Sequence, residues 1–436
     1  RPLAELARAL EADAILEGSM TVSGAAPGGA RRVRVRVRLI AAGTDAAVWT
    51  GIYDRMLGDV LALQADLAAA IAREVGLRIA PGTSARLTRL RATSPQVEDA
   101  YLRGRALLRR FGGDNLRAAV AAFEEAIAAD PTYAPPYPLL ARAYVSLGFF
   151  GAMTQPAARA AAARAAARAS ELGPNLPETH STLADLQFYY DWDWSAADAS
   201  YRRALELNPS DVYARTQYAR FLAARDETTA AVEQAAEARR LDPLSPEAAQ
   251  TLGLMLYYAR RYDDAAEAVE QALALDARYA RAHYVLGRIR EAQGRIDEAI
   301  ASTERAVSLT PGLPTGWMLQ LARHHALAGR PTEARARLRE LERQQADGRL
   351  SIAPQHFAYA RLALGEVDAA LALLERAVAV RDPAVLWLAV DPRVDPLRGL
   401  PRFERLLATL QAGAIAAPAA ALEPSGGGGF SSNVAR

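Results

Sequence analysis

The 436-residue sequence contains no cysteine, and none of its basic residues is lysine. The missing thiol excludes disulfides, thiolate metal ligands and cysteine nucleophiles. The missing lysine excludes the P-loop lysine, the kinase strand lysine and any Schiff base. All 52 basic side chains are therefore arginines, and a formal net charge of only +2 predicts that this chain makes no direct contact with nucleic acid.

Other signatures of catalysis and membrane insertion are missing as well. No apolar run approaches the roughly 18 to 20 residues that a membrane-spanning helix needs, so the sequence predicts no spanning segment. The five histidines have no carboxylate at metal-ligand spacing, and the GGGG run at 426–429 follows no strand and opens no helix. The sequence therefore predicts no catalytic, cofactor-binding or metal-binding residue, and no enzyme activity in this chain.

The stretch RRVRVRVRLI (31–40) alternates arginine with apolar side chains. Successive side chains of a strand point to opposite faces, so this pattern predicts a half-buried strand with a solvated arginine face. An anion or nucleic-acid surface is the alternative, but it would need stacking aromatic residues or a recognition helix beside the charge. Further strands are expected at 13–24 and 46–56, and helices at 3–12 and 58–79.

A set of residues in this first segment matches a known pattern, namely Leu16, Glu17, Gly18, Ser19, Trp49, Tyr53, Asp54, Arg55 and Gln64. Through them the segment resembles the TolB-amino-terminal-like α/β domain of bacterial signalling proteins over residues 3 to 79. QADL replaces the family's acidic QDEI, and AAPGG lengthens the first hairpin. The resemblance implies a domain that follows a winged-helix, Ser/Thr kinase or nucleotide cyclase domain and precedes a repeat array. Since the chain starts at Arg1, we expect the family's leading strand and helix to lie upstream.

Small residues recur along the rest of the chain with a period of 34. They allow two antiparallel helices to approach closely, and a proline then ends the second helix. This pattern is the signature of the tetratricopeptide (TPR) repeat, and residues 252–280 and 286–314 resemble it almost position for position. The small positions are Ala219, Gly253 and Gly287, then Ala231, Ala265 and Ala299, then Ala238, Ala272 and Ala306, with Pro243 and Pro311 in the proline slot.

The sequence thus predicts a mostly α fold, a right-handed TPR solenoid of about eight helical hairpins preceded by a small truncated α/β domain. We expect a partial TolB-like domain at 1–80, a linker at 81–95 and the solenoid at 96–383. A capping helix region at 384–411 would cover the open hydrophobic end, and the Ala-, Pro- and Gly-rich residues 412–436 are expected to form a disordered tail. The aromatic stretch FYYDWDW (188–194) is interpreted as filler between two helices, with a docking site as the alternative.

A TPR array presents the first helix of each repeat along a concave groove, and the motif's register places tyrosine and arginine there. Such a groove suits an extended acidic peptide or a terminal carboxylate, although a plain solvated surface is the alternative. The candidate groove residues are Tyr213, Arg220, Tyr257, Tyr258, Arg281, Tyr284, Arg288 and Arg323.

Together these features predict a non-catalytic protein–protein interaction or sensory region of a bacterial regulatory protein, with a protein or peptide partner and no cofactor. One alternative is a fragment of a Ser/Thr kinase, an adenylate or guanylate cyclase or a winged-helix transcriptional regulator whose effector domain lies upstream. Another is an envelope assembly or secretion scaffold. The sequence does not decide whether the chain forms a homo-oligomer. It is also compatible with two compartments, the bacterial cytoplasm or, if an upstream segment spans the membrane, the periplasm.

Overall fold

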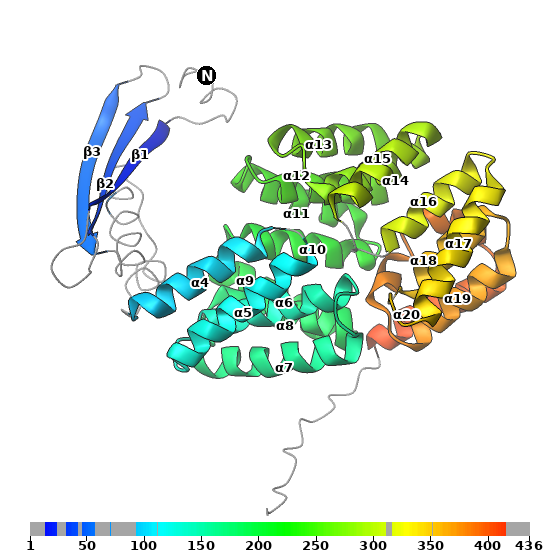
Figure 1. Ribbon diagram of the computed structural model, residues 1–436, viewed down its shortest axis with the longest axis horizontal. Coiled ribbons are helices and arrows are strands. Elements are labelled where there is room, and N and C mark those ends of the chain that lie inside the picture. Colours follow the sequence, from blue (N-terminus) through cyan, green and yellow to red (C-terminus); the bar gives the residue numbers. More distant parts are fainter. Residues whose placement is uncertain are drawn as a thin grey trace, which may run out of the picture.

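A computed structural model of the chain describes residues 14–23, 32–41, 46–56, 70, 93–110, 112–310, 316–350 and 352–415. Figure 1 shows a small sheet near the N-terminus and a coil of paired helices. The sheet has three antiparallel strands in the order β1-β2-β3, and they span Ala14–Ser23, Arg32–Ala41 and Ala47–Met56. The predicted helices at 3–12 and 58–79 lie outside the described residues, apart from Ala70.

The faces of β2 are arranged as the alternating pattern predicts. Val33 and Val37 are buried, whereas Arg34 and Arg38 are exposed. The Arg34 guanidinium lies 2.8 Å from Asp54 of β3, and that of Arg38 lies 3.2 Å from Glu17 of β1. The prediction of a solvated arginine face is therefore confirmed for these two arginines, whose charges are balanced by carboxylates of the neighbouring strands.

The helical region consists of eight antiparallel helix pairs within the described residues, as the sequence predicts. In each pair the first helix packs against the second, and the even-numbered helix comes first. The pairs are α4 Pro95–Leu108 with α5 Gly113–Ala129, α6 Pro136–Phe149 with α7 Gln155–Leu172, α8 Pro177–Leu186 with α9 Trp194–Leu207, α10 Val212–Ala224 with α11 Thr228–Leu241, α12 Pro246–Tyr258 with α13 Tyr262–Leu275, α14 Ala280–Ala292 with α15 Ile296–Leu309, α16 Gly316–Leu327 with α17 Pro331–Ala346, and α18 Pro354–Ala363 with α19 Val367–Ala379.

Several of these helices begin at capping residues that the sequence carries. The side chains of Ser94, Asp211 and Ser245 each accept a hydrogen bond from the backbone N–H of the third residue of the helix that follows. Such caps satisfy donors that have no partner within the helix. α4 and α12 also start with proline, whose fixed φ suits the first helical turn and whose missing N–H costs nothing there.

Small side chains lie where the paired helices meet. All six repeating alanines at the second and third small positions are fully buried. At Gly253 an added Cβ would come 2.9 Å from the carbonyl oxygen of Ala265 and closer still to Val269. At Gly287 it would come 3.1 Å from the carbonyl oxygen of Ala299. The 34-residue pattern therefore marks positions where the backbones approach too closely for a larger residue.

The aromatic stretch at 188–194 fills the space between α8 and α9, as interpreted from the sequence. A turn of π-helix, η2 (Gln187–Asp191), follows α8, and Trp192 then takes a left-handed conformation with φ of 57°. Phe188 and Trp192 are almost completely buried. Asp193 caps α9 by accepting a hydrogen bond of 2.9 Å from the N–H of Ala196. Phe188 and Trp192 therefore belong to the core, in agreement with the interpretation as filler between two helices.

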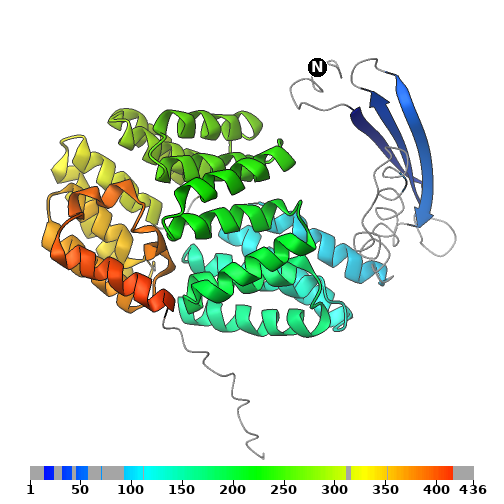
Figure 2. The ribbon, with the colours of Figure 1, turned by 180° about the vertical axis from the view of Figure 1, so that it is seen from behind.

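The chain beyond α19 turns back across the coil. Two 3₁₀ turns, η3 (Pro383–Trp387) and η4 (Pro392–Leu397), precede α20 (Pro401–Ile415). α20 packs on α19, as a terminal cap should, but it also contacts α9, while η3 contacts α10 and η2. Figures 1 and 2 show α18–α20 beside the early repeats. The C-terminal turns thus join the end of the array to its middle, and one hydrophobic core extends from Val97 to Leu410.

Among the described helices, none combines the length and hydrophobicity that crossing a lipid bilayer requires.

Candidate functional site

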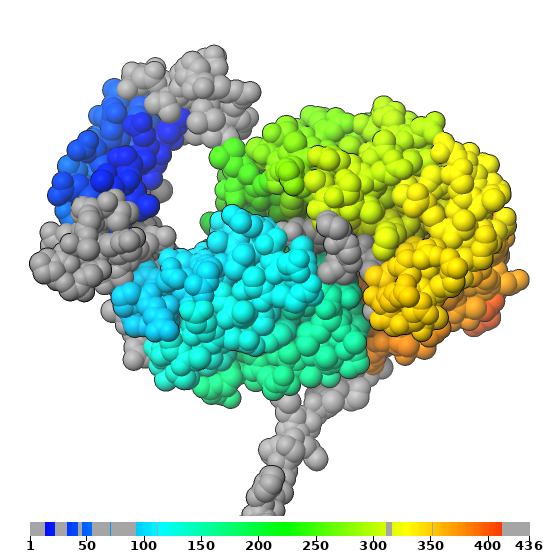
Figure 3. Space-filling view, viewed as in Figure 1, coloured from blue at the N-terminus to red at the C-terminus, as the bar shows by residue number. Residues whose placement is uncertain are grey.

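The first helices of successive pairs line the inner side of the coil, where two adjoining hollows lie. In the space-filling view α4–α6 face α14–α18 across the centre (Figure 3). The larger hollow, which we call the central cavity, has a volume of about 320 Å³. Its walls come from α6, α10, α12, α14, α16 and α18, and from the segment 380–393. The smaller hollow, of about 90 Å³, is called the basic groove.

Arginine dominates the basic groove. It is lined by Arg109, Arg110, Arg142, Arg220 and Arg281, and its only acidic residue among the described ones is Glu247. The Arg281 guanidinium lies 3.5 Å from a Glu247 oxygen. Although burial favours the protonated acid, Arg281 and Arg142 hold the pKa of Glu247 below its usual value. The groove therefore keeps a surplus of positive charge.

Two aromatic rings support these guanidinium groups. Arg142 stacks on the ring of Tyr213, with its central carbon 3.2 Å from the ring centre. Tyr213 in turn donates a hydrogen bond to the buried carboxylate of Asp185. Arg281 lies 5.9 Å from the ring centre of Phe150. Contacts of this kind hold an arginine in place while leaving its N–H groups for an anion.

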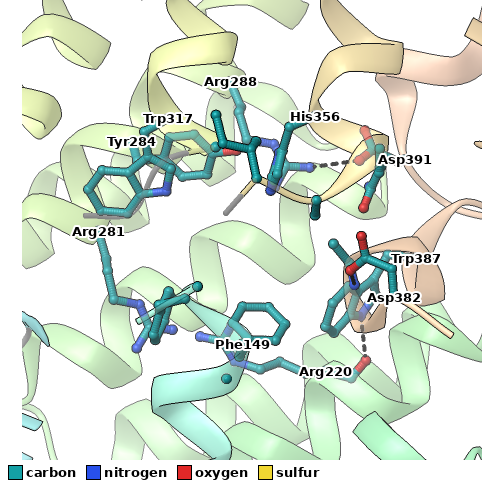
Figure 4. A pocket seen from close by; sticks show the side chains of 18 of the residues that line it. Phe149, Arg220, Arg281, Tyr284, Arg288, Trp317, His356, Asp382, Trp387 and Asp391 are labelled. Carbon is teal, nitrogen blue, oxygen red and sulfur yellow. Dashed lines mark hydrogen bonds and ion pairs between the residues drawn. The ribbon is translucent and has the colours of Figure 1, made fainter. Parts of the chain in front are cut away.

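Arg220 connects the basic groove with the central cavity, because it lines both. Arg220 is 8% exposed. One of its guanidinium nitrogens donates a hydrogen bond of 3.1 Å to the Thr251 hydroxyl, whereas its Nε has no hydrogen-bond partner. Burial, together with the charge of Arg281, lowers the pKa of Arg220. Figure 4 shows both guanidinium groups reaching toward the same part of the cavity beside Phe149.

At the opposite wall, one carboxylate holds two buried arginines. Asp391, which precedes η4, lies 2.6 Å from Arg393 and 3.2 Å from Arg288. Burial acts to raise the pKa of Asp391, but Arg393 and Arg288 outweigh it and hold the pKa well below its usual range. The side chain of Tyr359 also donates a hydrogen bond of 3.2 Å to Asp391. This cluster ties the C-terminal turns to α14 and α18.

Aromatic rings form the remaining walls of the cavity. Tyr284 and Trp317 stack with their ring centres 4.8 Å apart and their planes inclined by 10°. Across the cavity the indole N–H of Trp387 donates to the backbone carbonyl of Arg220 at 2.8 Å (Figure 4). His356 lies between these walls, where burial and then the charges of Arg393 and Arg288 lower its pKa to about 3. His356 is therefore uncharged at neutral pH.

The structure brings six of the eight candidate residues to these two hollows. Tyr258, Tyr284 and Arg288 line the central cavity, Tyr213 lines the basic groove, and Arg220 and Arg281 line both.

The other two lie behind the walls. Tyr257 is 1% exposed and packs its ring 4.6 Å from the Arg288 guanidinium. Arg323 is paired with Glu291 at 2.8 Å and donates to the carbonyl oxygen of Tyr359.

Sequence reasoning missed several residues of the site. Arg142 directly follows the small residue Ala141, as Arg220 follows Ala219, so the repeat register could have identified it. Gln250 and Trp317 also lie on first helices but carry no comparable signal. Asp391 and Arg393 lie about 100 residues from Arg288 in the sequence, and only the folding back of the C-terminal turns brings them to the cavity.

His324 and His325 are buried and each lies close to one carboxylate. His324 is fully buried and lies 3.0 Å from Glu291, and His325 lies 3.2 Å from Glu333 on the next helix. Within the described parts of the chain, no three histidine or acidic side chains are grouped so that they could hold a metal ion.

Comparison with known proteins relates the helical region to one repeat type. The tetratricopeptide repeat profile matches residues 251–314, and a search of curated proteins finds no match. Among solved structures, a monomeric mutant of IFIT1 with Gppp-AAAA is 16% identical, covers 80% of this chain and 76% of that one, and has a TM-score of 0.50. The Cut9–Hcn1 complex of the APC/C is 14% identical, covers 68% of this chain and 55% of that one, and scores 0.49.

A shorter structure, that of PilF from Pseudomonas aeruginosa, is 20% identical, covers 47% of this chain and 90% of that one, and scores 0.35. Identities this low bear on the fold alone. The matched repeats, the eight helix pairs and the small residues at their contacts agree with one another. Residues 251–314 are thus similar to the tetratricopeptide repeat, and the helical region has the fold of a TPR-type solenoid.

Proposed function

We propose that this chain is a non-catalytic scaffold for protein–protein interaction, and that the basic groove binds an extended acidic segment or a terminal carboxylate of a partner protein. The observation that carries the proposal is the excess of arginine there, five side chains against the single carboxylate of Glu247. The planar guanidinium group of arginine can donate two parallel hydrogen bonds to a carboxylate. Stacking on the Tyr213 ring holds the guanidinium of Arg142 in a fixed orientation for such a contact.

The groove also has the exposure that a peptide needs. Arg109 and Arg110 are exposed at the end of α4, and Arg142, Tyr213 and Arg281 are half-buried. A partner chain would therefore meet the solvent-facing arginines first and the stacked ones deeper in the groove. Opposite charges on partner and groove would steer the encounter and make binding weaker at higher salt.

A defined peptide tests this proposal. Anisotropy of a fluorescein-labelled decapeptide of alternating glutamate and leucine should show binding to the full chain. The same peptide with glutamine in place of glutamate should bind at least about tenfold more weakly, since a charge-assisted hydrogen bond is worth about 1.5 to 3 kcal/mol. The double variant Arg109→Glu/Arg142→Glu should abolish the preference for glutamate.

The matched control is Arg203→Glu on α9, an exposed arginine that lies outside both hollows and pairs with Glu206. This variant changes the net charge by the same amount per residue and should retain the binding. Equal binding of the two peptides, or an equal loss with Arg203→Glu, would contradict the proposal.

We also propose that the sheet at 14–56 is part of a TolB-like domain and that the whole protein is a bacterial regulator. Support comes from the matching residues around Gly18 and Trp49 and from the antiparallel order of the three strands. The division into 1–80, 81–95, 96–383, 384–411 and 412–436 is part of this proposal. The reading frame preceding the codon for Arg1 tests it. A winged-helix, kinase or cyclase domain there would support a regulator, and a lipoprotein signal would instead support the envelope scaffold.

A further inference from the structure

Buried polar atoms without hydrogen-bond partners gather around the central cavity. Eleven such side-chain atoms are found in the described residues, and six of them belong to residues that line this one cavity. They are Gln155 Oε1, Arg220 Nε, Gln250 Oε1, Arg288 Nε, Gln355 Oε1 and Asp382 Oδ2. An unpartnered buried polar atom costs about 1 to 3 kcal/mol, so a cluster of six is not expected from packing alone.

These atoms are held firmly in place. Gln250 is 1% exposed, Gln355 is 3% exposed and donates to the Tyr359 hydroxyl, and Asp382 is 5% exposed. Asp382 uses its other oxygen to cap η3 by accepting from the N–H of Ala384 at 2.9 Å. Gln355 and Asp382 are thus each held by one hydrogen bond while their second oxygen, Oε1 of Gln355 or Oδ2 of Asp382, has no partner.

The chemistry of the cavity is complementary to a particular kind of small molecule. Arg220 and Arg288 offer N–H donors that carry positive charge, while Gln250 and Gln355 offer carbonyl acceptors. The stacked pair of Tyr284 and Trp317 provides a flat wall. A volume of about 320 Å³ is at the lower end of the roughly 300 to 1,000 Å³ of small-molecule pockets.

We propose that the central cavity binds a small aromatic anion, whose carboxylate or phosphate accepts from Arg220 and whose ring N–H or exocyclic amino group donates to Gln250. The ring lies against the wall formed by Tyr284 and Trp317. This inference goes beyond the proposed protein scaffold. Since the C-terminal turns form one side of the cavity, the ligand would also strengthen the closure of the coil, as a regulatory effector would.

Calorimetric titration of the full chain tests the proposal with two matched pairs of probes. Indole-3-acetate is compared with the uncharged indole-3-acetamide, and AMP with adenosine, so that the two arms distinguish a carboxylate from a phosphate. At least one anion should bind at least tenfold more tightly than its neutral counterpart. Arg220→Met should remove that difference, because methionine keeps much of the side-chain volume but supplies no N–H donor.

Two further variants separate the possible outcomes. Gln250→Met should weaken indole-3-acetate and indole-3-acetamide equally, which gives a second test if Arg220→Met does not fold. Arg109→Glu/Arg142→Glu, which alters only the basic groove, should change the binding of the anion by less than about twofold. If this double variant loses peptide binding but retains anion binding, the peptide and the anion bind at separate sites, and the two proposals can be judged independently.

Absence of binding by both anions at millimolar concentration would show a cavity that holds only water, and it would overturn the proposal. An affinity for the anion that Arg220→Met leaves unchanged would overturn it as well.

Discussion

The arginines of strand β2 and those of the inner side of the coil are identical side chains in opposite surroundings. Arg34 is 63% exposed at its side chain, and it meets Asp54 on a surface covered by water. Arg288 and Arg393 are each 5% exposed and share the carboxylate of Asp391. Water screens the first pair, so its contribution to stability is small. Water does not screen the buried cluster, so each of its charges is stabilised only by the others.

Within the coil the same contrast appears in a second form. The two arginines at Asp391 share its carboxylate, whereas Arg220 has no carboxylate partner among the described residues and donates to the Thr251 hydroxyl. Burial and the nearby Arg281 both oppose the charge of Arg220. The ion pair therefore assigns Arg288 mainly to the structure, and the lack of an ion pair makes Arg220 the anchor of the proposed ligand site. Four mutational experiments test this division, and they are ordered from the largest expected effect to the smallest.

Replacing Asp391 with alanine should destabilise the protein most. The change leaves Arg288 and Arg393 buried without their carboxylate, which typically costs about 3 to 5 kcal/mol. Urea denaturation followed by circular dichroism measures this loss. Asp395→Ala in the same segment is the control, because the ion pairs of Asp395 with Arg260 and Arg398 are partly exposed and should contribute less than about 1 kcal/mol.

The contribution of Asp391 should also depend on pH. Its folded-state pKa lies below the unfolded value near 4, so the stabilisation is complete above that value and is lost as the pH falls through the folded pKa. The difference in stability between wild type and Asp391→Ala should therefore narrow in acid. A difference that stays constant down to pH 3 would show that the two arginines do not depend on Asp391.

Replacing Asp382 with asparagine should stabilise the protein at neutral pH. Burial raises the pKa of Asp382 to about 6, which is above the pKa of the same group in the unfolded chain. The free energy of unfolding therefore decreases as the pH rises from the unfolded pKa to the folded pKa. Asparagine keeps an oxygen for the cap on Ala384 without the charge. A gain on the order of 2 kcal/mol at pH 7, shrinking toward pH 4, is expected in the same denaturation experiment. A destabilised Asp382→Asn at pH 7 would contradict it.

Replacing Arg220 with methionine should leave stability within about 1 kcal/mol of the wild type or raise it slightly. The substitution removes a buried cation that Arg281 opposes, and its main cost is the hydrogen bond to Thr251. Thermal unfolding without added ligand measures the effect. A loss comparable to that of Asp391→Ala would place Arg220 among the structural arginines and remove the contrast.

The exposed pair on the sheet should show the smallest effect. A double-mutant cycle on Arg34→Ala and Asp54→Ala should give a coupling energy between 0 and about 1 kcal/mol that falls as salt is added. Protection of the β2 amides from hydrogen exchange measures it locally. A coupling above about 2 kcal/mol would mean that the sheet surface behaves like the interior of the coil.

The sequence predicts much of the fold because its signals are local. Alternation at Val33 and Val37 depends only on the geometry of a strand, and the 34-residue recurrence of Ala219, Gly253 and Gly287 depends only on contacts between neighbouring helices. The structure confirms both patterns. The candidate site is predicted only in part, since the repeat register indicates which face Arg220 occupies but not what lies opposite.

Periodicity by itself determined that this chain forms a solenoid of helix pairs, because each repeat meets only its neighbours and carries the small residues that this contact needs. Tertiary structure alone decided which inner arginines are paired with a carboxylate of this chain. The carboxylate of Asp391 reaches Arg288 across 103 positions of the chain, and no local pattern records such a contact. The free energy of a buried charge depends on its nearest partners in space, whatever their distance in sequence.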